Sequence, residues 1–446
     1  MYKLPKICIC GIGYVGLTLA VIMAEKGFEV TGVEIRPEIV ESLQKGIPHF
    51  HEIGLEMLLQ LYVNKNLKFT TTIPDEKFDV FVITVGTPLK TGFKEPDLQY
   101  IINVAEGISH HLNKNALVVL RSTVVIGTTR QVVLPILAKN NPVVNIAFCP
   151  ERTIEGKALE ELKVLPQIVG GINQESVEKS ITLFRKITPT VIEVSSLETA
   201  EMVKLLDNAY RDLNFAFANE VAGLCEHIGI DGLEVVRAGR MGYPRTHIPD
   251  PGYVGGACLE KDPHILSYSA GQYFYSPCLV KHARQIHEAL PGIVVRRIQE
   301  LLLAYGKDPA NAKIFISGMA FKGQPETDDL RGSPSLILLD ELKKIGAHQI
   351  FAHDFIVTAN TIAHLGVKPV SIEAGFKDAD VVLIANNHVK YKGLNIFSLL
   401  TQMNQPAIFY DSWRLFDKAA FTRIPGIHYE GLGYRQNLTG RENHHG

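Results

Sequence analysis

Two stretches of the sequence carry side chains whose types and spacing could do chemistry on a small molecule. Lys204 and Asn208 lie four residues apart where apolar residues recur at helical spacing, so both side chains leave one face of a helix. Cys258 follows a glycine pair in a loop, with Lys261 and Asp262 beside it, and is well placed to act as a thiolate nucleophile. The alternatives are a solvated lysine–asparagine surface and a small buried cysteine, which is the commoner role of that residue.

A glycine-rich turn, Gly11-Ile12-Gly13-Tyr14-Val15-Gly16, follows a strand-like apolar run and precedes a helix-like run. Its first glycine permits a tight turn, its second lets a pyrophosphate approach the backbone, and its third lets the helix pack on the strand. Glu34 ends the next predicted strand, where an acid binds the ribose hydroxyls of NAD and repels a 2′-phosphate; Arg36 nearby acts in the opposite direction. We therefore predict an NAD site from Gly11, Gly13, Tyr14, Val15, Gly16, Glu34 and Arg36.

Three further short apolar strands are each followed by a polar loop. Ligands of open α/β sheets bind at the carboxyl ends of the strands, so these loops are expected to line the site, although any single one could be a plain turn. The strands and their loops are Val80–Val85 with Gly86-Thr87-Pro88, Leu117–Leu120 with Arg121-Ser122-Thr123, and Asn145–Cys149 with Pro150-Glu151-Arg152.

The elements that must position these residues form two α/β halves around one long helix. Residues 197–229 keep a helical apolar pattern without proline, and a helix of that length spans on the order of 45 Å. From Ala312 a second series of strands and helices repeats the first half without a GxGxxG turn, with a helix predicted over Ser335–Ile345. We predict an α/β fold of two Rossmann-like doubly wound domains joined by a long central helix, divided as 1–196, 197–300 and 301–446. Residues 249–263 are expected to be a shaped loop without regular structure.

The bulk composition narrows the function classes. The 446 residues have a net charge of −2, which argues against nucleic acid or a membrane surface as the main partner. The six cysteines form no CxxC pair, so neither a disulfide framework nor a zinc site is expected, and the chain suits a reducing cytoplasm. The apolar run Ile7–Ala24 is similar to a signal peptide or membrane span, but glycines interrupt it. We expect the tail from Gln436 to be frayed, and its two histidines to be solvated rather than metal ligands.

The order of motifs points to a family. GIGYVG, VGTP, RSTV, CPER, the helix with Lys204 and Asn208, GGACLEKD and FKGQPETDDLRGSP follow one another along the chain. This series resembles the nucleotide-sugar 6-dehydrogenases, the UDP-glucose and UDP-N-acetylhexosamine dehydrogenases, from Lys6 to about Asp417. The resemblance implies that domain 1–196 binds NAD, that 197–300 carries the dimer contacts and the cysteine loop, and that 301–446 binds the UDP-sugar.

The resemblance also implies a reaction, in which NAD takes hydride twice from C6 of the sugar and converts the alcohol to the acid. A thiohemiacetal and then a thioester on Cys258 would keep the aldehyde from escaping. Lys204 and Asn208 would stabilise the oxyanion, and Lys204 near Glu151 or Asp262 would form a mixed-charge site with shifted pKa values. Asp262 would orient or activate the hydrolytic water, and Glu151 with Thr123 would serve as the acid/base element.

Further site residues follow from the motif matches. Arg245 matches a position that reaches the substrate of the neighbouring subunit, which implies a homodimer. Lys322 matches a substrate-side lysine, Arg331 an arginine near the cofactor, and Arg414 an arginine at the uridine end. The implied cofactor site adds Thr87, Thr123 and Arg331 to the glycine turn, and the implied substrate site comprises Glu151, Arg152, Lys204, Asn208, Arg245, Tyr253, Gly255, Lys322 and Arg414.

The sequence also departs from the family pattern. The stretch from Phe321 to Arg331 is about two residues longer than usual, and alanine precedes Cys258 where serine or histidine is frequent. CPERTIEGKALEEL is more similar to the N-acetylhexosamine branch, which favours UDP-N-acetylmannosamine or UDP-N-acetylglucosamine over UDP-glucose. The product would be a uronic acid for surface polysaccharide.

Other functions remain open from the sequence. UDP-glucose is the alternative substrate within the family. A two-electron 3-hydroxyacid-type dehydrogenase shares the dinucleotide-binding half and the lysine–asparagine helix, but it needs neither the cysteine loop nor a second α/β half. A non-catalytic sensor of NAD or nucleotide sugar would not need Cys258 or Lys204, and both are present.

Overall fold

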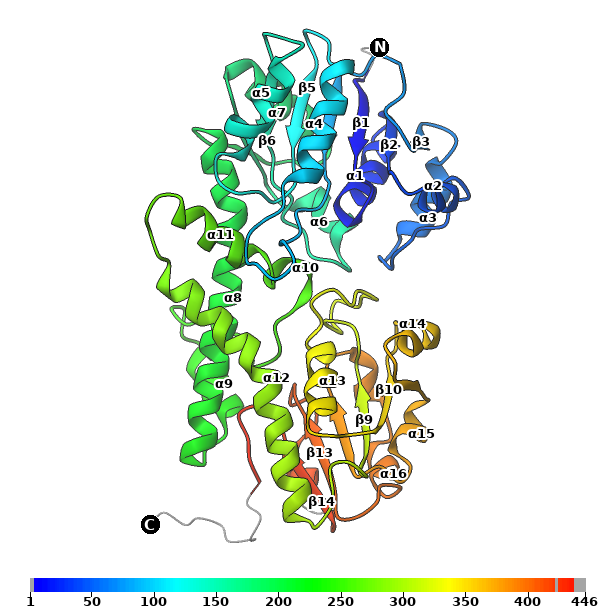
Figure 1. Ribbon diagram of the computed structural model, residues 1–446, viewed down its shortest axis with the longest axis vertical. Helices are drawn as coiled ribbons and strands as arrows, with labels where there is room; N and C mark the ends of the chain where they lie inside the picture. Colours follow the sequence, from blue (N-terminus) through cyan, green and yellow to red (C-terminus); the bar gives the residue numbers. More distant parts are fainter. Residues whose placement is uncertain (1–3, 422–423, 437–446) are drawn as a thin grey trace. The chain divides into compact units, whose positions relative to one another are not determined.

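A computed structural model describes residues 4–421 and 424–436, which divide into two compact units (Figure 1). Unit 1 holds the described residues up to Ala209 together with Lys261–Pro277, and unit 2 holds Tyr210–Glu260 with the described residues from Cys278 onward. The long helix α8, Leu197–Ile228, begins in unit 1 and ends in unit 2. The division at 196/197 and 300/301 stays a prediction.

Unit 1 is built on an eight-stranded sheet in the order β3-β2-β1-β4-β5-β6-β7-β8. Its first six strands are parallel, β7 runs antiparallel to β6, and the chain order reverses between β1 and β4, where doubly wound sheets bind ligands. The strands are β1 Lys6–Cys10, β2 Glu29–Val33, β3 Leu67–Thr70, β4 Val80–Ile83, β5 Leu117–Leu120, β6 Asn145–Phe148, β7 Gln167–Gly171 and β8 Val191–Glu193.

Both faces of this sheet are buried, because alternate residues of its strands enter two separate hydrophobic cores. Ile7 and Ile9 of β1 belong to one core, and Cys8 and Cys10 to the other. This explains why the strands are continuous apolar runs rather than alternating ones. Apart from α8, the helices of the unit are α1 Tyr14–Glu25, α2 Pro37–Gln44, α3 Leu55–Tyr62, α4 Gln99–His111, the π-helical turn η1 Thr129–Val133, α5 Leu134–Ala138, α6 Ala158–Val164, α7 Gln174–Phe184 and α11 Asp262–Gly271.

Unit 2 repeats the same strand order in a six-stranded parallel sheet, β11-β10-β9-β12-β13-β14. Ile314 and Ile316 of β9 pack into one core and Phe315 into the other, so this sheet is also covered on both faces. The strands are β9 Lys313–Ser317, β10 Gln349–His353, β11 Lys368–Pro369, β12 Val381–Ile384, β13 Ala407–Asp411 and β14 Ile427–Glu430.

The helices of unit 2 include α12, Cys278–Ala304, which packs against α13, Pro334–Lys344, beside the sheet (Figure 1). The others are α9 Gly232–Arg240, α10 Gly256–Leu259, α14 Ala359–His364, α15 Ile372–Phe376, the 3₁₀ turn η2 Val389–Gly393, α16 Ile396–Leu400 and α17 Lys418–Phe421.

The predicted fold class is confirmed, with a mainly parallel sheet in unit 1 and a parallel sheet in unit 2. The long helix ends one residue earlier than predicted, and the helix predicted over Ser335–Ile345 is α13. One expectation is wrong: residues 249–263 are not wholly irregular, because Gly256–Leu259 form the helical turn α10 and Asp262 begins α11. The tail beyond Gln436, with its two histidines, lies outside the described residues.

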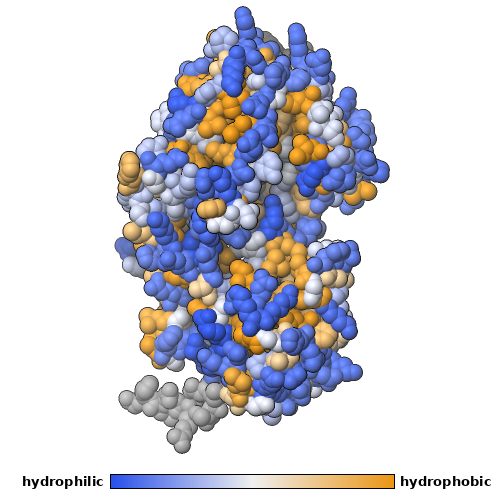
Figure 2. All heavy atoms as spheres, viewed as in Figure 1, coloured by the Kyte–Doolittle hydropathy of each residue, from blue (hydrophilic) through white to orange (hydrophobic). Residues whose placement is uncertain are grey.

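The run Ile7–Ala24 forms strand β1, the glycine turn and most of helix α1. Within residues 4–421 and 424–436, no helix combines the length and apolar character needed to cross a membrane. On the face drawn in Figure 2, hydrophilic side chains surround separate hydrophobic patches.

Candidate functional site

The glycine turn of unit 1 has the geometry of a phosphate cradle. Gly11 has φ +98°, and a Cβ on Gly16 would lie 1.9 Å from the Gly11 carbonyl oxygen. A Cβ on Gly13 would meet nothing within 4 Å, so the space above the turn is open. No side chain caps the N-terminus of α1, and its first turn holds no acid, which leaves backbone N–H groups available to an anion. The turn therefore fits the pyrophosphate of a dinucleotide.

Glu34 lies just beyond the end of β2 and is almost fully buried. Burial raises the pKa of Glu34, but the Arg36 guanidinium, with Nε 2.9 Å from Oε1, outweighs it and holds the pKa below its usual range. Glu34 is therefore a carboxylate, as an acceptor for ribose hydroxyls requires. Arg36 is committed to this ion pair although its side chain is half exposed.

The loops after β4 and β5 meet through a chain of hydrogen bonds. Thr87 Oγ1 donates to the Thr123 carbonyl oxygen at 2.6 Å, and Lys261 Nζ donates to Thr87 Oγ1 at 3.1 Å. Three residues from distant parts of the sequence are thus brought together at the carboxyl edge of the sheet.

Lys204 lies inside unit 1 and not on a solvated surface. Its Nζ is 3.4 Å from Glu151 Oε2, and both side chains are about nine-tenths buried. Burial raises the pKa of Glu151, but Lys204, Thr153 and Arg121 together hold it below its usual range. The predicted mixed-charge contact of Lys204 is therefore with Glu151, which is ionised.

Arg121 is a buried charge in a loop that the sequence predicted to line the site, although no role was assigned to it. Its guanidinium donates to the Cys149 carbonyl oxygen at 3.0 Å and to Gln167 Oε1 at 2.7 Å. Burial lowers the pKa of Arg121, and its positive charge also acts on Glu151. Its signals in the sequence were its position directly after a buried strand and its place in the RSTV motif.

Asn208 and Asp262 form the second buried polar pair of unit 1. Asn208 Nδ2 donates to Asp262 Oδ2 at 2.6 Å, and Asp262 is fully buried at the start of α11. Asp262 Oδ1 accepts no hydrogen bond from the described residues and lies 3.5 Å from Lys261 Nζ. This carboxylate therefore has an oxygen with capacity for a further donor, such as a water.

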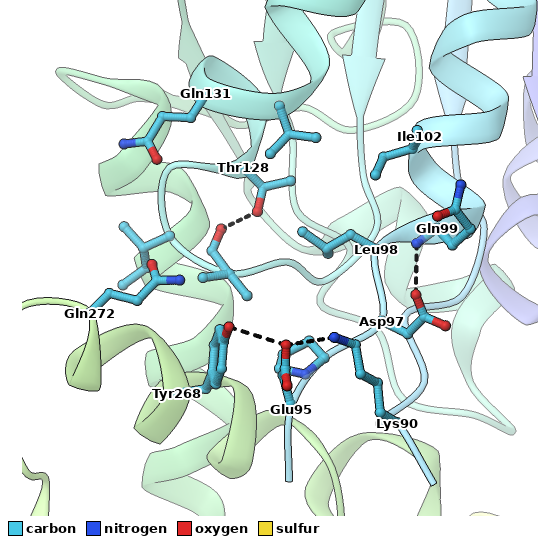
Figure 3. Close-up of a pocket in the computed structure, with 14 residues that line it drawn as sticks. Lys90, Glu95, Asp97, Leu98, Gln99, Ile102, Thr128, Gln131, Tyr268 and Gln272 are labelled. Atoms are coloured by element: carbon cyan, nitrogen blue, oxygen red, sulfur yellow. Dashed lines mark hydrogen bonds and ion pairs between the residues drawn. The ribbon is translucent and has the colours of Figure 1, made fainter. Parts of the chain in front are cut away.

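Arg152 is held at the rim of the same unit by Asp207, with Nε 2.9 Å from Oδ2. A separate cavity of about 330 Å³ lies beside the loop that follows Thr123 (Figure 3). Tyr268 donates to Glu95, which also pairs with Lys90, along one wall of this cavity. None of the predicted site residues lines it.

Cys258 belongs to unit 2, where it is exposed on α10. Glycines before it have no room for a side chain: a Cβ on Gly255 would lie 2.1 Å from the Gly332 carbonyl oxygen, and Gly256 has φ +91°. Tyr253 is buried with its hydroxyl 3.3 Å from Ser412 Oγ, and burial raises its pKa above the usual range. The loop that carries the thiol thus has a fixed shape.

The remaining predicted residues of unit 2 contact four different sets of neighbours. Arg245 is exposed and stacks over Tyr243 at 5.4 Å, and Lys322 lies over Phe321 at 5.2 Å. Arg331 pairs with Asp329 at 2.6 Å and is largely exposed. Arg414 is buried, with NH2 2.8 Å from Asp231 Oδ2 and its guanidinium 4.8 Å from the Tyr434 ring.

Comparisons with known proteins agree over most of the chain. Sequence models of the UDP-glucose/GDP-mannose dehydrogenase family match residues 5–188 with its NAD binding domain, 198–289 with its central domain and 315–418 with its UDP binding domain. A UDP-N-acetyl-D-mannosamine dehydrogenase from Campylobacter jejuni is 34% identical over 411 residues, covering 88% of this chain and 97% of the relative.

Two solved structures share the fold over nearly their whole length. The UDP-D-ManNAc dehydrogenase from Pyrococcus horikoshii has a TM-score of 0.87 and 29% identity, covering 96% of this chain and 99% of that one. A UDP-glucose dehydrogenase from Pyrobaculum islandicum has a TM-score of 0.85 and 27% identity, covering 97% and 98%. The resemblance that the motif order indicated is confirmed.

The Lys204–Glu151 pair gives a prediction for stability. Lys204→Met leaves the Glu151 carboxylate buried without its main partner, which should cost roughly 3–5 kcal/mol of unfolding free energy at neutral pH. Because the folded-state pKa of Glu151 is lowered, this stability is present above its unfolded pKa, about 4.3, and is lost as the pH falls through the folded value. Denaturant unfolding at several pH values should show the difference from wild type shrinking below about pH 4.

Lys163→Met is the matched control, because Lys163 pairs with Glu25 near the surface. It should cost at most about 1 kcal/mol, as exposed pairs do. A Lys204→Met variant with the same small, pH-independent loss would mean that the buried pair is not formed.

Proposed function

This chain belongs to the UDP-glucose/GDP-mannose dehydrogenase family, and on that basis we propose that it oxidises UDP-N-acetyl-D-mannosamine at C6 to the uronic acid. It is an NAD-dependent oxidoreductase that acts on the CH–OH group of a UDP-sugar. The name of the Campylobacter jejuni relative and the CPERTIEGKALEEL segment support an N-acetylhexosamine substrate over UDP-glucose.

The observation that carries the reaction is the burial of Lys204 and Asn208, one turn apart on α8, each against a carboxylate. Hydrogen-bond donors held in a dry site can stabilise an oxyanion far better than donors in water. We assign these two side chains to the oxygen at C6. Lys204 is the charged donor and Asn208 the neutral one.

Cys258 is proposed as the nucleophile between the two oxidation steps. Its thiolate adds to the aldehyde carbon and gives a thiohemiacetal, and loss of hydride from that carbon gives a thioester. Water then attacks the thioester carbon, the carbon–sulfur bond breaks, and the thiolate and the carboxylate are released. Overall, one alcohol, two NAD and one water give one carboxylate, two NADH and three protons.

Asp262 and Glu151 are proposed to orient the hydrolytic water and to take a proton from it. The Asp262 oxygen without a hydrogen-bond partner among the described residues can accept from a water, and Glu151, ionised beside Lys204, can take a proton. Thr123 belongs to the same loop cluster through its carbonyl oxygen and Thr87. Bound NAD supplies the hydride acceptor, held by the glycine turn and Glu34.

The other assignments rest on motif matches. Thr87, Thr123, Arg36 and Arg331 are proposed on the cofactor side, and Arg152, Tyr253, Gly255, Lys322 and Arg414 on the substrate side. Residues 1–196, 197–300 and 301–446 are proposed as the NAD, dimerisation and UDP-sugar regions. We place the enzyme in the cytoplasm, where its uronic acid product would supply surface polysaccharide.

A homodimer is proposed from the outer face of α8. Tyr210, Phe217, Leu224 and Ile228 are all more than half exposed and recur at intervals of seven, seven and four residues, as in a helix–helix seam. Such an apolar stripe on a helix is self-complementary across a two-fold axis. Arg245 is exposed and follows α9 in the sequence. We propose that it reaches the substrate of the partner subunit.

The substrate proposal is tested by NADH formed per sugar consumed. Purified protein is given UDP-N-acetylmannosamine, UDP-N-acetylglucosamine and UDP-glucose in parallel, and we expect two NADH per sugar with the first. Two NADH per sugar with UDP-glucose alone would show that the enzyme is a UDP-glucose dehydrogenase. One NADH per sugar would indicate a two-electron dehydrogenase, and none with any sugar would support a sensor.

The role of Cys258 is tested by Cys258→Ser, which should abolish acid formation because the covalent step needs a thiolate. NAD affinity, measured by calorimetry, should be unchanged, since the glycine turn lies in unit 1. Acid formation at the wild-type rate would remove Cys258 from the mechanism.

The dimer is tested by Phe217→Glu, which puts a charge in the middle of the apolar stripe. Sedimentation should show a monomer, and the KM for the UDP-sugar should rise because Arg245 no longer reaches a neighbour. Glu234→Lys, also exposed in unit 2 but on α9, is the control and should stay dimeric. An unchanged dimer in Phe217→Glu would contradict the proposed interface.

A further inference from the structure

Unit 2 contains a buried charged cluster that lies outside the site described above. Asp212 on α8 and Arg284 and His287 on α12 are each at least 95% buried. Arg284 NH1 lies 2.8 Å from Asp212 Oδ1, and His287 Nε2 donates to the Asp212 carbonyl oxygen at 2.9 Å. Burial lowers the pKa of His287 to about 4, so the ring is neutral and Arg284 balances the charge of Asp212.

Burying such a pair is costly, and a pair of apolar residues could hold two helices together as well or better. One hydrogen bond of the cluster connects it to the loop that carries Cys258. Arg284 NH1 also donates to the carbonyl oxygen of Leu259 at 3.1 Å. Leu259 is the residue after Cys258 and the last residue of α10, where a carbonyl group has no partner within the helix itself.

The other end of the same loop is held by Asn219, one further polar residue of α8. Its Nδ2 donates to the Gly252 carbonyl oxygen at 2.9 Å, and its Oδ1 accepts from the Gly252 N–H at 2.9 Å. Asn219 Nδ2 also lies 3.5 Å from His287 Nδ1, which joins it to the charged cluster. The segment Gly252–Leu259 is therefore fixed at both ends by one connected buried network.

The opposite side of the segment is closely packed. A Cβ on Gly252 would lie 2.4 Å from Trp413, and Gly256 N donates to the Gly332 carbonyl oxygen at 3.0 Å. The loop thus packs against Trp413 and Gly332 on one side and is hydrogen-bonded to Asn219 and Arg284 on the other. Loss of the hydrogen bonds from either residue should therefore change the position of the Cys258 thiol, which lies between them in the sequence.

We propose that Arg284, Asp212 and Asn219 are positioning residues for Cys258, which set the orientation of its thiol by holding both ends of the segment Gly252–Leu259. Asp212 acts on the loop through Arg284, and none of the three touches the reacting atoms. The proposal rests on the proposed role of Cys258 as the nucleophile. A purely structural cluster would stabilise unit 2 without affecting the fate of the aldehyde.

The test variant is Arg284→Lys, which keeps a positive charge near Asp212. Its side chain is one bond shorter, so its nitrogen does not reach the position from which Nη1 of Arg284 donates to both Asp212 and the Leu259 carbonyl oxygen. We expect the rate of the thiol-dependent step to fall by at least about tenfold, since a misplacement of 1 Å can cost about 100-fold. The first oxidation does not need the thiol, so aldehyde should escape. NADH per sugar should fall from two toward one, and hydroxylamine should trap the aldehyde, with the KM for the UDP-sugar little changed.

Arg297→Lys is the matched control. Arg297 also forms a largely buried ion pair in unit 2, with Glu430 at 2.6 Å, and neither this partner nor its second one, Glu300, belongs to the cysteine loop. Arg297→Lys should still form two NADH per sugar, even if its thermal stability is lower than that of wild type. If Arg284→Lys also gives two NADH per sugar, at the turnover of Arg297→Lys, the positioning role is wrong.

A second readout needs no substrate and separates this proposal from the proposed function. Alkylation by iodoacetamide is followed by peptide mass spectrometry, with exposed Cys278 as the internal reference. Arg284→Lys should change the rate at Cys258 relative to Cys278 by at least about threefold, because local order governs thiol access and thiolate character. An unchanged ratio would overturn the proposal even if wild type oxidises none of the three sugars.

Asn219→Ser serves if Arg284→Lys does not fold, as judged by circular dichroism. It releases only the Gly252 end of the segment and leaves the Arg284–Asp212 pair intact. The same change in the Cys258 to Cys278 ratio and the same loss of NADH per sugar are expected. Wild-type values for both would contradict the proposal.

Discussion

The arrangement depends on one constraint, which is that helix α8 buries a stripe of polar side chains. Glu201, Lys204, Asn208, Asp212 and Asn219 recur at intervals of three, four, four and seven residues and are all buried. A buried polar or charged group is costly unless it finds a partner with good geometry. Each residue of the stripe therefore needs a hydrogen-bonding or oppositely charged partner packed against it.

The partners of this stripe are the segments that carry the proposed chemistry. Glu201 accepts from the Gly127 and Thr129 N–H groups, which fixes the start of η1 in the loop after Thr123. Lys204 and Asn208 bind the carboxylates of Glu151 and Asp262 within unit 1. The later members act within unit 2 on the cysteine loop. One helix register thus fixes several loops that are far apart in the sequence, and it does so with groups whose electrostatic effects are strong because water is excluded.

Much of the fold could be predicted from the sequence, because it depends on local patterns. The strands β4, β5 and β6 are apolar runs ended by polar loops, and the glycine turn specifies a strand, a phosphate cradle and a helix. The family resemblance implied a contact of Lys204 with either Glu151 or Asp262, and the structure shows Glu151. The burial of the polar stripe could not be predicted from periodicity, since a polar helix face is ordinarily solvated. Arg284 and Asn219 were missed because their contacts with the cysteine loop are to main-chain groups, which leave no pattern in the sequence.

The second sheet shows how a repeated topology can serve a different purpose. Asp354, at the end of β10, stands where the acid of a dinucleotide-binding half would hold a ribose, but its Oδ2 accepts from the Met319 and Ala320 N–H groups at 2.7 and 3.0 Å. The Asp354 carboxylate is thus bound to main-chain N–H groups of the turn after β9. Unit 2 therefore lacks the GxGxxG turn of unit 1 and pairs its acid with main-chain N–H groups, and its sequence matches the UDP binding domain of the family.

The exposed face of α8 is the counterpart of its buried polar stripe. The buried face of α8 combines the polar stripe with apolar residues such as Leu205 and Ala209. Leu206, Tyr210, Phe217 and Leu224 face outward, where a helix of a globular protein usually carries polar side chains. Apolar area left in water costs about 25 cal/mol per Å², and a contiguous stripe of aromatic and aliphatic side chains is typical of an interface. The register that buries the proposed catalytic groups in unit 1 is therefore the same register that exposes the apolar stripe proposed as the dimer interface. A change that rotated this helix would expose Lys204 and Asn208 and bury the apolar stripe together, so the proposed interface and the proposed site depend on one helix register.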